Sequence, residues 1–270
     1  MTAISRITTQ KKDRGRYNIF LDDGQGESYG FSVDEAVLVA YRLHKQMELD
    51  DATIQALIRQ DTFHKHYTLA INFLSYRMRT KQEIRTYLDQ KDVDEEQLDQ
   101  IMDKLITEGL VDDRQFAESF VRTRQNTTNK GPKLVEQELR QKGVDAALAS
   151  EAVSAYTFAG QYDTALKLAL KKRSASHAKS FQQKIQQIQG TLMQKGFTSD
   201  VIQAITNELQ NERDDDAEWE ALIKQGEKLH RKHQQKYSGA ELEQKVKEAL
   251  YRKGFTLDLI QQFLDDSRAE

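Results

Sequence analysis

The spacing of apolar and polar residues gives the beginning of the chain a different character from the rest. The runs Ile4–Thr9, Tyr17–Leu21 and Tyr29–Val33 carry strand signals, and in the second and third runs apolar residues recur at every second position, which is typical of β-strands. Asp22–Gly26 separates the second and third runs and contains two glycines, which favours a hairpin loop. Beyond residue 33 the period becomes helical, first over 34–43 and again from Asp51. We therefore expect a small three-stranded segment followed by one or two helices.

A block of ten residues recurs four times after residue 66 without gaps. In each block an apolar residue precedes a leucine by four positions, which places both on one face of a helix. A lysine follows, then glycine in three blocks and Asp92 in the first, and finally Val or Phe. Glycine adopts the left-handed conformation that ends a helix, and the apolar residue after it completes a Schellman-type stop. The four blocks are Ile84–Val93, Val135–Val144, Ile188–Phe197 and Val246–Phe255.

Each block is flanked by signals for two more helices. A helical pattern precedes each block, over Tyr67–Tyr76, Asp113–Arg124, Asp163–Lys172 and Asp216–His233. An Asp or Thr suited to cap the next helix follows each block, at Asp94, Asp145, Thr198 and Thr256. The fold class expected is therefore mainly α. Three-helix repeats at 67–112, 113–160, 161–211 and 212–270 should stack in an elongated, curved array after an N-terminal β-hairpin and helix segment at 1–66.

Composition restricts the function classes. The chain lacks cysteine and has a net charge of −3, which excludes thiolate chemistry and opposes indiscriminate binding to nucleic acid. No apolar stretch is long enough to cross a membrane, so we expect a soluble, cytoplasmic protein with no membrane contact. The charge is uneven, however, because residues 161–211 hold seven basic and three acidic residues. Any contact with a polyanion should therefore be local.

The residues that could carry catalysis form no convincing constellation. His230 and His233 could share a helix face, but two histidines do not by themselves complete a metal site. Asp214–Asp216 stands where a helix N-terminus favours negative charge, and Trp219 is expected to pack in a core. We expect no enzyme activity, no metal and no cofactor.

Basic residues recur at the junction between the first and second helix of each repeat. If the repeats stack regularly, these exposed side chains would form a basic row that faces DNA phosphate or an acidic protein surface. A simple solvated face is the alternative interpretation for each cluster. The candidate binding residues are Arg77, Arg79, Lys81, Arg85, Arg122, Arg124, Lys130, Lys133, Lys171, Lys172 and Arg173.

One stretch of the sequence is similar to a known family. The pattern Tyr67-x-x-Ala70-x-x-x-Leu74-Ser75-x-Arg77-x-Arg79-Thr80-x-x-Glu83-Ile84 resembles the opening of RecX, the bacterial regulator of the RecA recombinase. Gly109–Ala117, and Gly131 followed by Leu139-x-x-Lys142-Gly143, support the same likeness. The match is strong over residues 67–145. Shorter family members carry three repeats, so the fourth unit here departs from their pattern.

The resemblance implies a non-enzymatic protein whose partner is the RecA filament on single-stranded DNA. Such a protein binds in the filament groove and inhibits ATP hydrolysis, strand exchange and filament growth, which regulates recombinational repair and the SOS response. We also expect a monomer with, at most, weak direct contact to DNA. Two alternatives stay open: a helical-repeat protein that binds DNA without recombinase, and a structural adaptor between other proteins.

Overall fold

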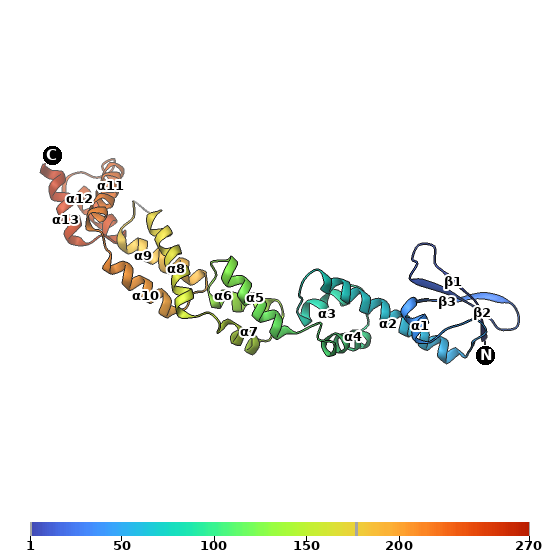
Figure 1. The fold of residues 1–270 in the computed structure, drawn as a ribbon. Helices are drawn as coiled ribbons and strands as arrows, with labels where there is room; N and C mark the ends of the chain where they lie inside the picture. The colour runs from blue at the N-terminus through green and yellow to red at the C-terminus, as the bar shows by residue number, and fades with distance from the viewer. Residues whose placement is uncertain (1, 176–177, 270) are drawn as a thin grey trace. The chain divides into compact units, whose positions relative to one another are not determined.

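The computed structural model describes residues 2–175 and 178–269. By their contacts, residues 1–116 with 142–144 form one compact unit, and residues 117–141 with 145–270 form a second. The first holds the strands and helices α1 to α4, and the second holds most of the remaining helices (Figure 1). Mainly helical architecture with a small N-terminal sheet is confirmed.

The N-terminal sheet contains the three expected strands and one further strand. Antiparallel strands β1 (Thr2–Thr9), β2 (Arg16–Asp22), β3 (Glu27–Asp34) and β4 (Glu48–Leu49) pair in the order β3-β2-β1-β4. Its apolar face packs Ile4, Ile19 and Phe31 against Leu57 of the following helix. The two-residue strand β4 was not expected, because a pair of residues carries no periodicity. Helix α1 (Glu35–Ala40) also ends three residues before the expected Leu43.

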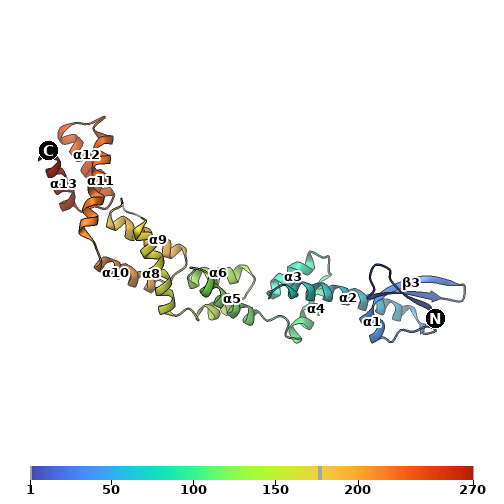
Figure 2. The same cartoon turned by 45° about the horizontal axis from the view of Figure 1, so that its top comes forward.

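Helix α2 (Asp51–Ser75) is one continuous helix of 25 residues. The expectation of a separate helix beginning at Tyr67 is therefore wrong, and the reason is that no glycine or proline interrupts 51–75. The N-terminal half of α2 packs on the sheet and its C-terminal half packs with α3 and α4 (Figure 2). Asp61 fastens α2 to the sheet, because its carboxylate pairs with Arg16 at 2.6 Å and accepts a hydrogen bond from the Asp34 amide.

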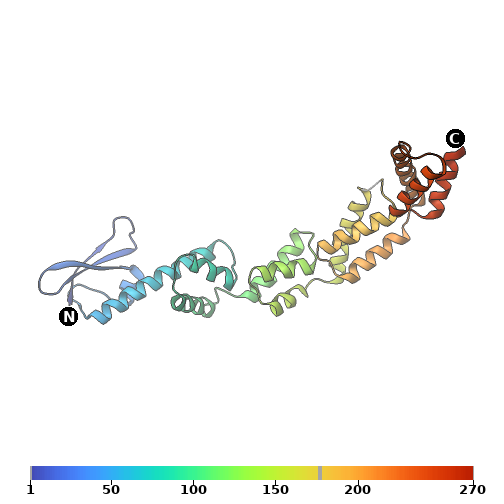
Figure 3. The ribbon, with the colours of Figure 1, turned by 180° about the vertical axis from the view of Figure 1, so that it is seen from behind.

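Beyond the sheet the helices pack in tandem sets of three, as expected (Figure 1, Figure 3). The apolar pairs of the repeated block lie in the cores, with Ile84 and Leu88 fully buried and Ile188 and Leu192 almost so. Trp219 packs against the fourth core. The sets are the end of α2 with α3 (Lys81–Asp89) and α4 (Glu95–Thr107); α5 (Asp113–Thr127), α6 (Pro132–Gln141) and α7 (Ala146–Val153); α8 (Phe158–Ser174), α9 (Phe181–Gln194) and α10 (Ser199–Asn211); and α11 (Asp215–His233), α12 (Gly239–Arg252) and α13 (Leu257–Ala269).

The corners that end the middle helices have the expected conformation. Gly143, Gly196 and Gly254 have φ angles of 84°, 81° and 82°, and Asp92 has a φ of 57°. At the third corner the Phe197 amide donates to the Leu192 carbonyl at 3.2 Å, which is the long hydrogen bond of a Schellman motif. In the first, third and fourth blocks the core leucine thus also accepts the bond that stops its helix.

The same corners contact the start of the preceding middle helix. The Gly131 amide donates to the Lys195 carbonyl at 2.7 Å, and the Lys133 amide donates to the Gly196 carbonyl at 3.0 Å. A Cβ on Gly196 would lie 2.4 Å from the backbone nitrogen of Leu134, far inside any normal contact. The glycine is therefore required twice, by its positive φ and by this close approach.

The other two corners repeat this arrangement with a hydroxyl donor. The Thr80 hydroxyl donates to the Lys142 carbonyl at 2.6 Å, and the Ser180 hydroxyl donates to the Lys253 carbonyl. Both hydroxyl residues are fully buried. Asp92 belongs to the first repeat, which has no preceding middle helix to approach, so that position tolerates a Cβ.

Candidate functional site

The basic segment of the first repeat is tied to its own helix α3. Thr80 caps α3 and forms a capping box with Glu83. The Arg77 guanidinium donates to both carboxylate oxygens of Glu83 at 3.0 Å, and the Lys142 ammonium donates to the same carboxylate at 3.0 Å. Partial burial raises the pKa of Glu83, but the hydrogen bonds and charges of Arg77 and Lys142 outweigh it and lower that pKa to about 2. Arg77 therefore stabilises the start of α3.

The basic residues near Arg77 are of two kinds, because some pack against other side chains and one is exposed. The Arg79 guanidinium lies 3.9 Å from the centre of the Phe73 ring, which stacks on Tyr87 at 4.1 Å. Arg85 forms an ion pair with Asp99. The side chain of Lys81 is exposed at the first position of α3, so it is the cation of this group best placed to meet a partner.

In the second repeat, one carboxylate gathers two of the predicted cations. Glu138 pairs with the Arg124 guanidinium at 2.9 Å and with the Lys130 ammonium. The Tyr156 hydroxyl is buried and has no hydrogen-bond partner among residues 2–175 and 178–269, and its pKa is raised to about 12 by that burial and by the charge of Glu138. Arg122 is fully on the exposed side of α5.

The remaining predicted cations lie at the start of α6 and the end of α8. Lys133 is exposed, and its charge helps to lower the pKa of Asp200, for which a hydrogen bond from Thr198 is the main cause. Lys171 and Lys172 are exposed, whereas Arg173 pairs with Glu212 at 2.9 Å.

The expectation that these cations are exposed is thus wrong for nearly half of them. The cations that are not exposed are half-buried because a neighbouring helix or aromatic ring supplies a partner for the charged group. Sequence spacing alone does not reveal that partner. Arg77 is exposed but also paired. The half-buried residues are Arg79, Arg85, Arg124, Lys130 and Arg173, and the other exposed cations of the set are Lys81, Arg122, Lys133, Lys171 and Lys172.

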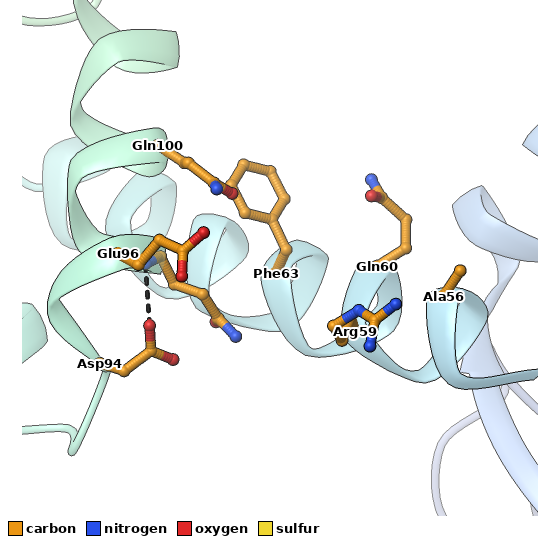
Figure 4. A pocket seen from close by; sticks show the side chains of 8 residues that line it. Ala56, Arg59, Gln60, Phe63, Asp94, Glu96 and Gln100 are labelled. Atoms are coloured by element: carbon orange, nitrogen blue, oxygen red, sulfur yellow. Dashed lines mark hydrogen bonds between the residues drawn. The ribbon is translucent and has the colours of Figure 1, made fainter. Parts of the chain in front are cut away.

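A groove that was not expected lies between α2 and the start of α4, with a volume of about 660 Å³ (Figure 4). Arg59, Gln60 and Phe63 line it from α2, and the first two turns of α4 form the opposite wall. The groove exists because α2 is continuous, which leaves one face of its middle turns uncovered. A helical spacing that ran unbroken through residue 66 was the signal that could have indicated it.

Neither a metal-binding cluster nor a membrane-spanning helix is found in the described part of the chain. Residues 2–175 and 178–269 contain no group of three or more His, Cys, Asp or Glu side chains that could hold a metal ion. No helix among these residues is long and apolar enough to span a membrane.

Comparison with family models covers most of the chain. The RecX N-terminal domain model matches residues 2–50, and the first and second RecX three-helix domain models match 67–105 and 112–153. The third three-helix domain model matches twice, at 160–206 and 216–264. The fourth repeat, which departs from the three-repeat pattern, is therefore a second domain of the third type.

Whole-length relatives and solved structures agree with these matches. Regulatory protein RecX from Oceanobacillus iheyensis is 52% identical over 269 residues, which is 99% of this chain and 98% of the relative. The protein of the same name from Bacillus cytotoxicus is 40% identical over 98% of this chain and 97% of its own.

Two crystal structures also align. One, of regulatory protein RecX, covers 77% of this chain and 100% of its own with 39% identity and a TM-score of 0.67. A second, of RecX from Lactobacillus salivarius, covers 56% of this chain and 98% of its own with 37% identity and a TM-score of 0.54. The chain therefore belongs to the RecX family of regulatory proteins.

Proposed function

We propose that the protein binds the filament that the RecA recombinase forms on single-stranded DNA and inhibits its ATP hydrolysis, strand exchange and growth. In this role it regulates recombinational DNA repair and the SOS response in the cytoplasm. The observation that carries the proposal is the match to RecX regulatory proteins along the whole chain. Regulatory relatives favour a binding role over catalysis.

The repeated architecture supports contact with a polymer. A tandem array presents equivalent positions once per repeat, so several weak contacts can add to a strong one. The exposed cations at these positions suit acidic protein or phosphate, and we assign them the contact. Those residues are Lys81, Arg122, Lys133, Lys171 and Lys172, chosen for their exposure, while Arg77, Arg124 and Arg173 pair with carboxylates and support the fold.

The test uses co-sedimentation with RecA filaments and the rate of ATP hydrolysis on single-stranded DNA. The variant K81E/R122E/K171E reverses three exposed cations without breaking an ion pair seen in the described chain. The control K11E/K12E/R14E changes net charge equally in an exposed loop before β2. We expect the first to inhibit about tenfold less well than the parent, since each contact contributes a modest part of the affinity, and the control to inhibit normally.

Three outcomes would contradict parts of this proposal. Equal inhibition by the two triple variants would show that the assigned residues do not contact the filament. Failure of the parent protein to co-sediment with RecA filaments would show that the proposed function is wrong. Tight, salt-sensitive binding to DNA without recombinase would favour the direct DNA-binding alternative, which the basic stretch 161–211 supports.

A further inference from the structure

The α2–α4 groove combines groups that recognise a polypeptide. Phe63 offers an apolar ring, and Figure 4 shows it pointing from α2 toward Gln100 of α4. Gln60, Gln97 and Gln100 place three primary amides around it. Each amide can donate to a carbonyl and accept from an N–H, which are the groups that a peptide backbone presents.

Most of these polar groups are not engaged elsewhere. Arg59, Gln60, Glu96 and Gln100 form no side-chain hydrogen bond or ion pair with any residue in the described part of the chain. Gln97 is held in place, because its backbone amide donates to Asp94 at 2.9 Å and its side-chain oxygen lies 2.9 Å from the His66 ring nitrogen. The groove therefore has a fixed wall and a set of free donors and acceptors.

The charge around the groove selects the kind of partner. Between Asp94 and Glu108, α4 and its cap contain six acidic residues and one basic residue. Glu96 lines the groove, and Asp94 stands at its end. Arg59 adds one cation to the lining against the two carboxylates Asp94 and Glu96, so the groove stays net negative. A phosphate backbone is therefore disfavoured there, whereas a lysine or arginine side chain would be attracted to the carboxylates.

We propose that the α2–α4 groove binds a segment of the recombinase polypeptide that carries a lysine or arginine. The segment's backbone pairs with the glutamine amides, its apolar atoms cover Phe63, and its cation meets Glu96. This inference rests on the proposed function and deepens it, because it assigns a second contact surface whose charge is opposite to that of the exposed cations.

The first test compares two neighbouring carboxylates of α4. Glu96 lines the groove, whereas Glu95, in the same helical turn, faces another part of the surface. E96K and E95K alter net charge and helix N-terminal charge equally. We expect E96K to weaken co-sedimentation of the full chain with RecA filaments about fivefold, as reversal of one exposed ion pair allows, and E95K to match the parent.

The second test locates the partner directly. The photo-crosslinker p-benzoylphenylalanine replaces Gln100 in one variant and Glu95 in a control, and irradiated filament complexes are analysed by mass spectrometry. We expect only the Gln100 variant to crosslink, and the captured RecA peptide to contain a lysine or arginine.

The outcomes separate this inference from the proposed function. If the parent co-sediments but E96K and E95K behave alike, or if the Gln100 variant crosslinks to DNA or not at all, the groove proposal is overturned and the proposed function stands. If the parent does not co-sediment, both are overturned.

Discussion

The corner glycines give the sharpest test of how one repeat contacts the next. We consider Gly196→Ala. Alanine at a φ of 81° is strained by about 1 kcal/mol. Its Cβ would also lie 2.4 Å from the Leu134 nitrogen, so the corner must move away from α6. That movement breaks the hydrogen bonds from Gly131 to Lys195 and from Lys133 to Gly196, each worth about 1 kcal/mol. The expected total is therefore about 3 kcal/mol of unfolding free energy.

Gly239→Ala is the matched control for this prediction. Gly239 lies in the same compact unit and has a φ of 54°, but a Cβ there would meet nothing within 4 Å. Gly239→Ala should therefore lower the unfolding free energy only through the strain of the positive φ, by about 1 kcal/mol. Urea denaturation followed by circular dichroism measures both. Equal destabilisation by the two alanines would show that the close approach contributes nothing and would refute the reasoning.

Three further outcomes follow from the side-chain contacts. The pKa of Glu83 is about 2 in the folded chain, below its ordinary value of 4.5, so its stabilising contribution is present above pH 4.5 and is lost as pH falls toward 2; the melting temperature of E83Q should depend less on pH in that range. R124E should lower the melting temperature because it places two carboxylates together, whereas R122E on the exposed side should leave it unchanged. Y156F should be neutral or stabilising because the hydroxyl it removes is buried with no hydrogen-bond partner in the described part of the chain, whereas Y67F, which loses a hydrogen bond to the Glu108 carboxylate, should destabilise. Thermal melts compare the two variants.

The features predicted correctly from sequence are those encoded by contiguous residues. A corner such as Leu192–Phe197 contains its own helix stop, because the glycine, the apolar residue after it and the accepting carbonyl are all local. The caps Asp94 and Asp145 accept hydrogen bonds from their own first turns in the same way. Pro132 begins α6, where its missing N–H costs no helical hydrogen bond.

The features missed depend on residues far apart in sequence. Arg124 stands at a basic junction by spacing, yet its environment is set by Glu138 on another helix. The second requirement for Gly196 comes from α6, which lies more than fifty residues earlier. The groove beside Phe63 needs both a continuous α2 and the position of α4. Periodicity identifies the elements but does not specify which side chains meet across them.

The corner contacts also give the series of repeats a direction of growth. Every junction joins a Lys-Gly corner to the start of the middle helix before it, so a duplicated repeat must supply both parts. A repeat inserted ahead of the first would meet Asp92, whose Cβ has no room against such a helix start, and would require Asp92→Gly. A repeat added after the fourth would instead meet Ser238, an exposed cap of the same hydroxyl type as the buried Ser180. The C-terminal side of the series therefore already presents a helix start that begins with a hydroxyl residue, as α9 does at the corner it contacts.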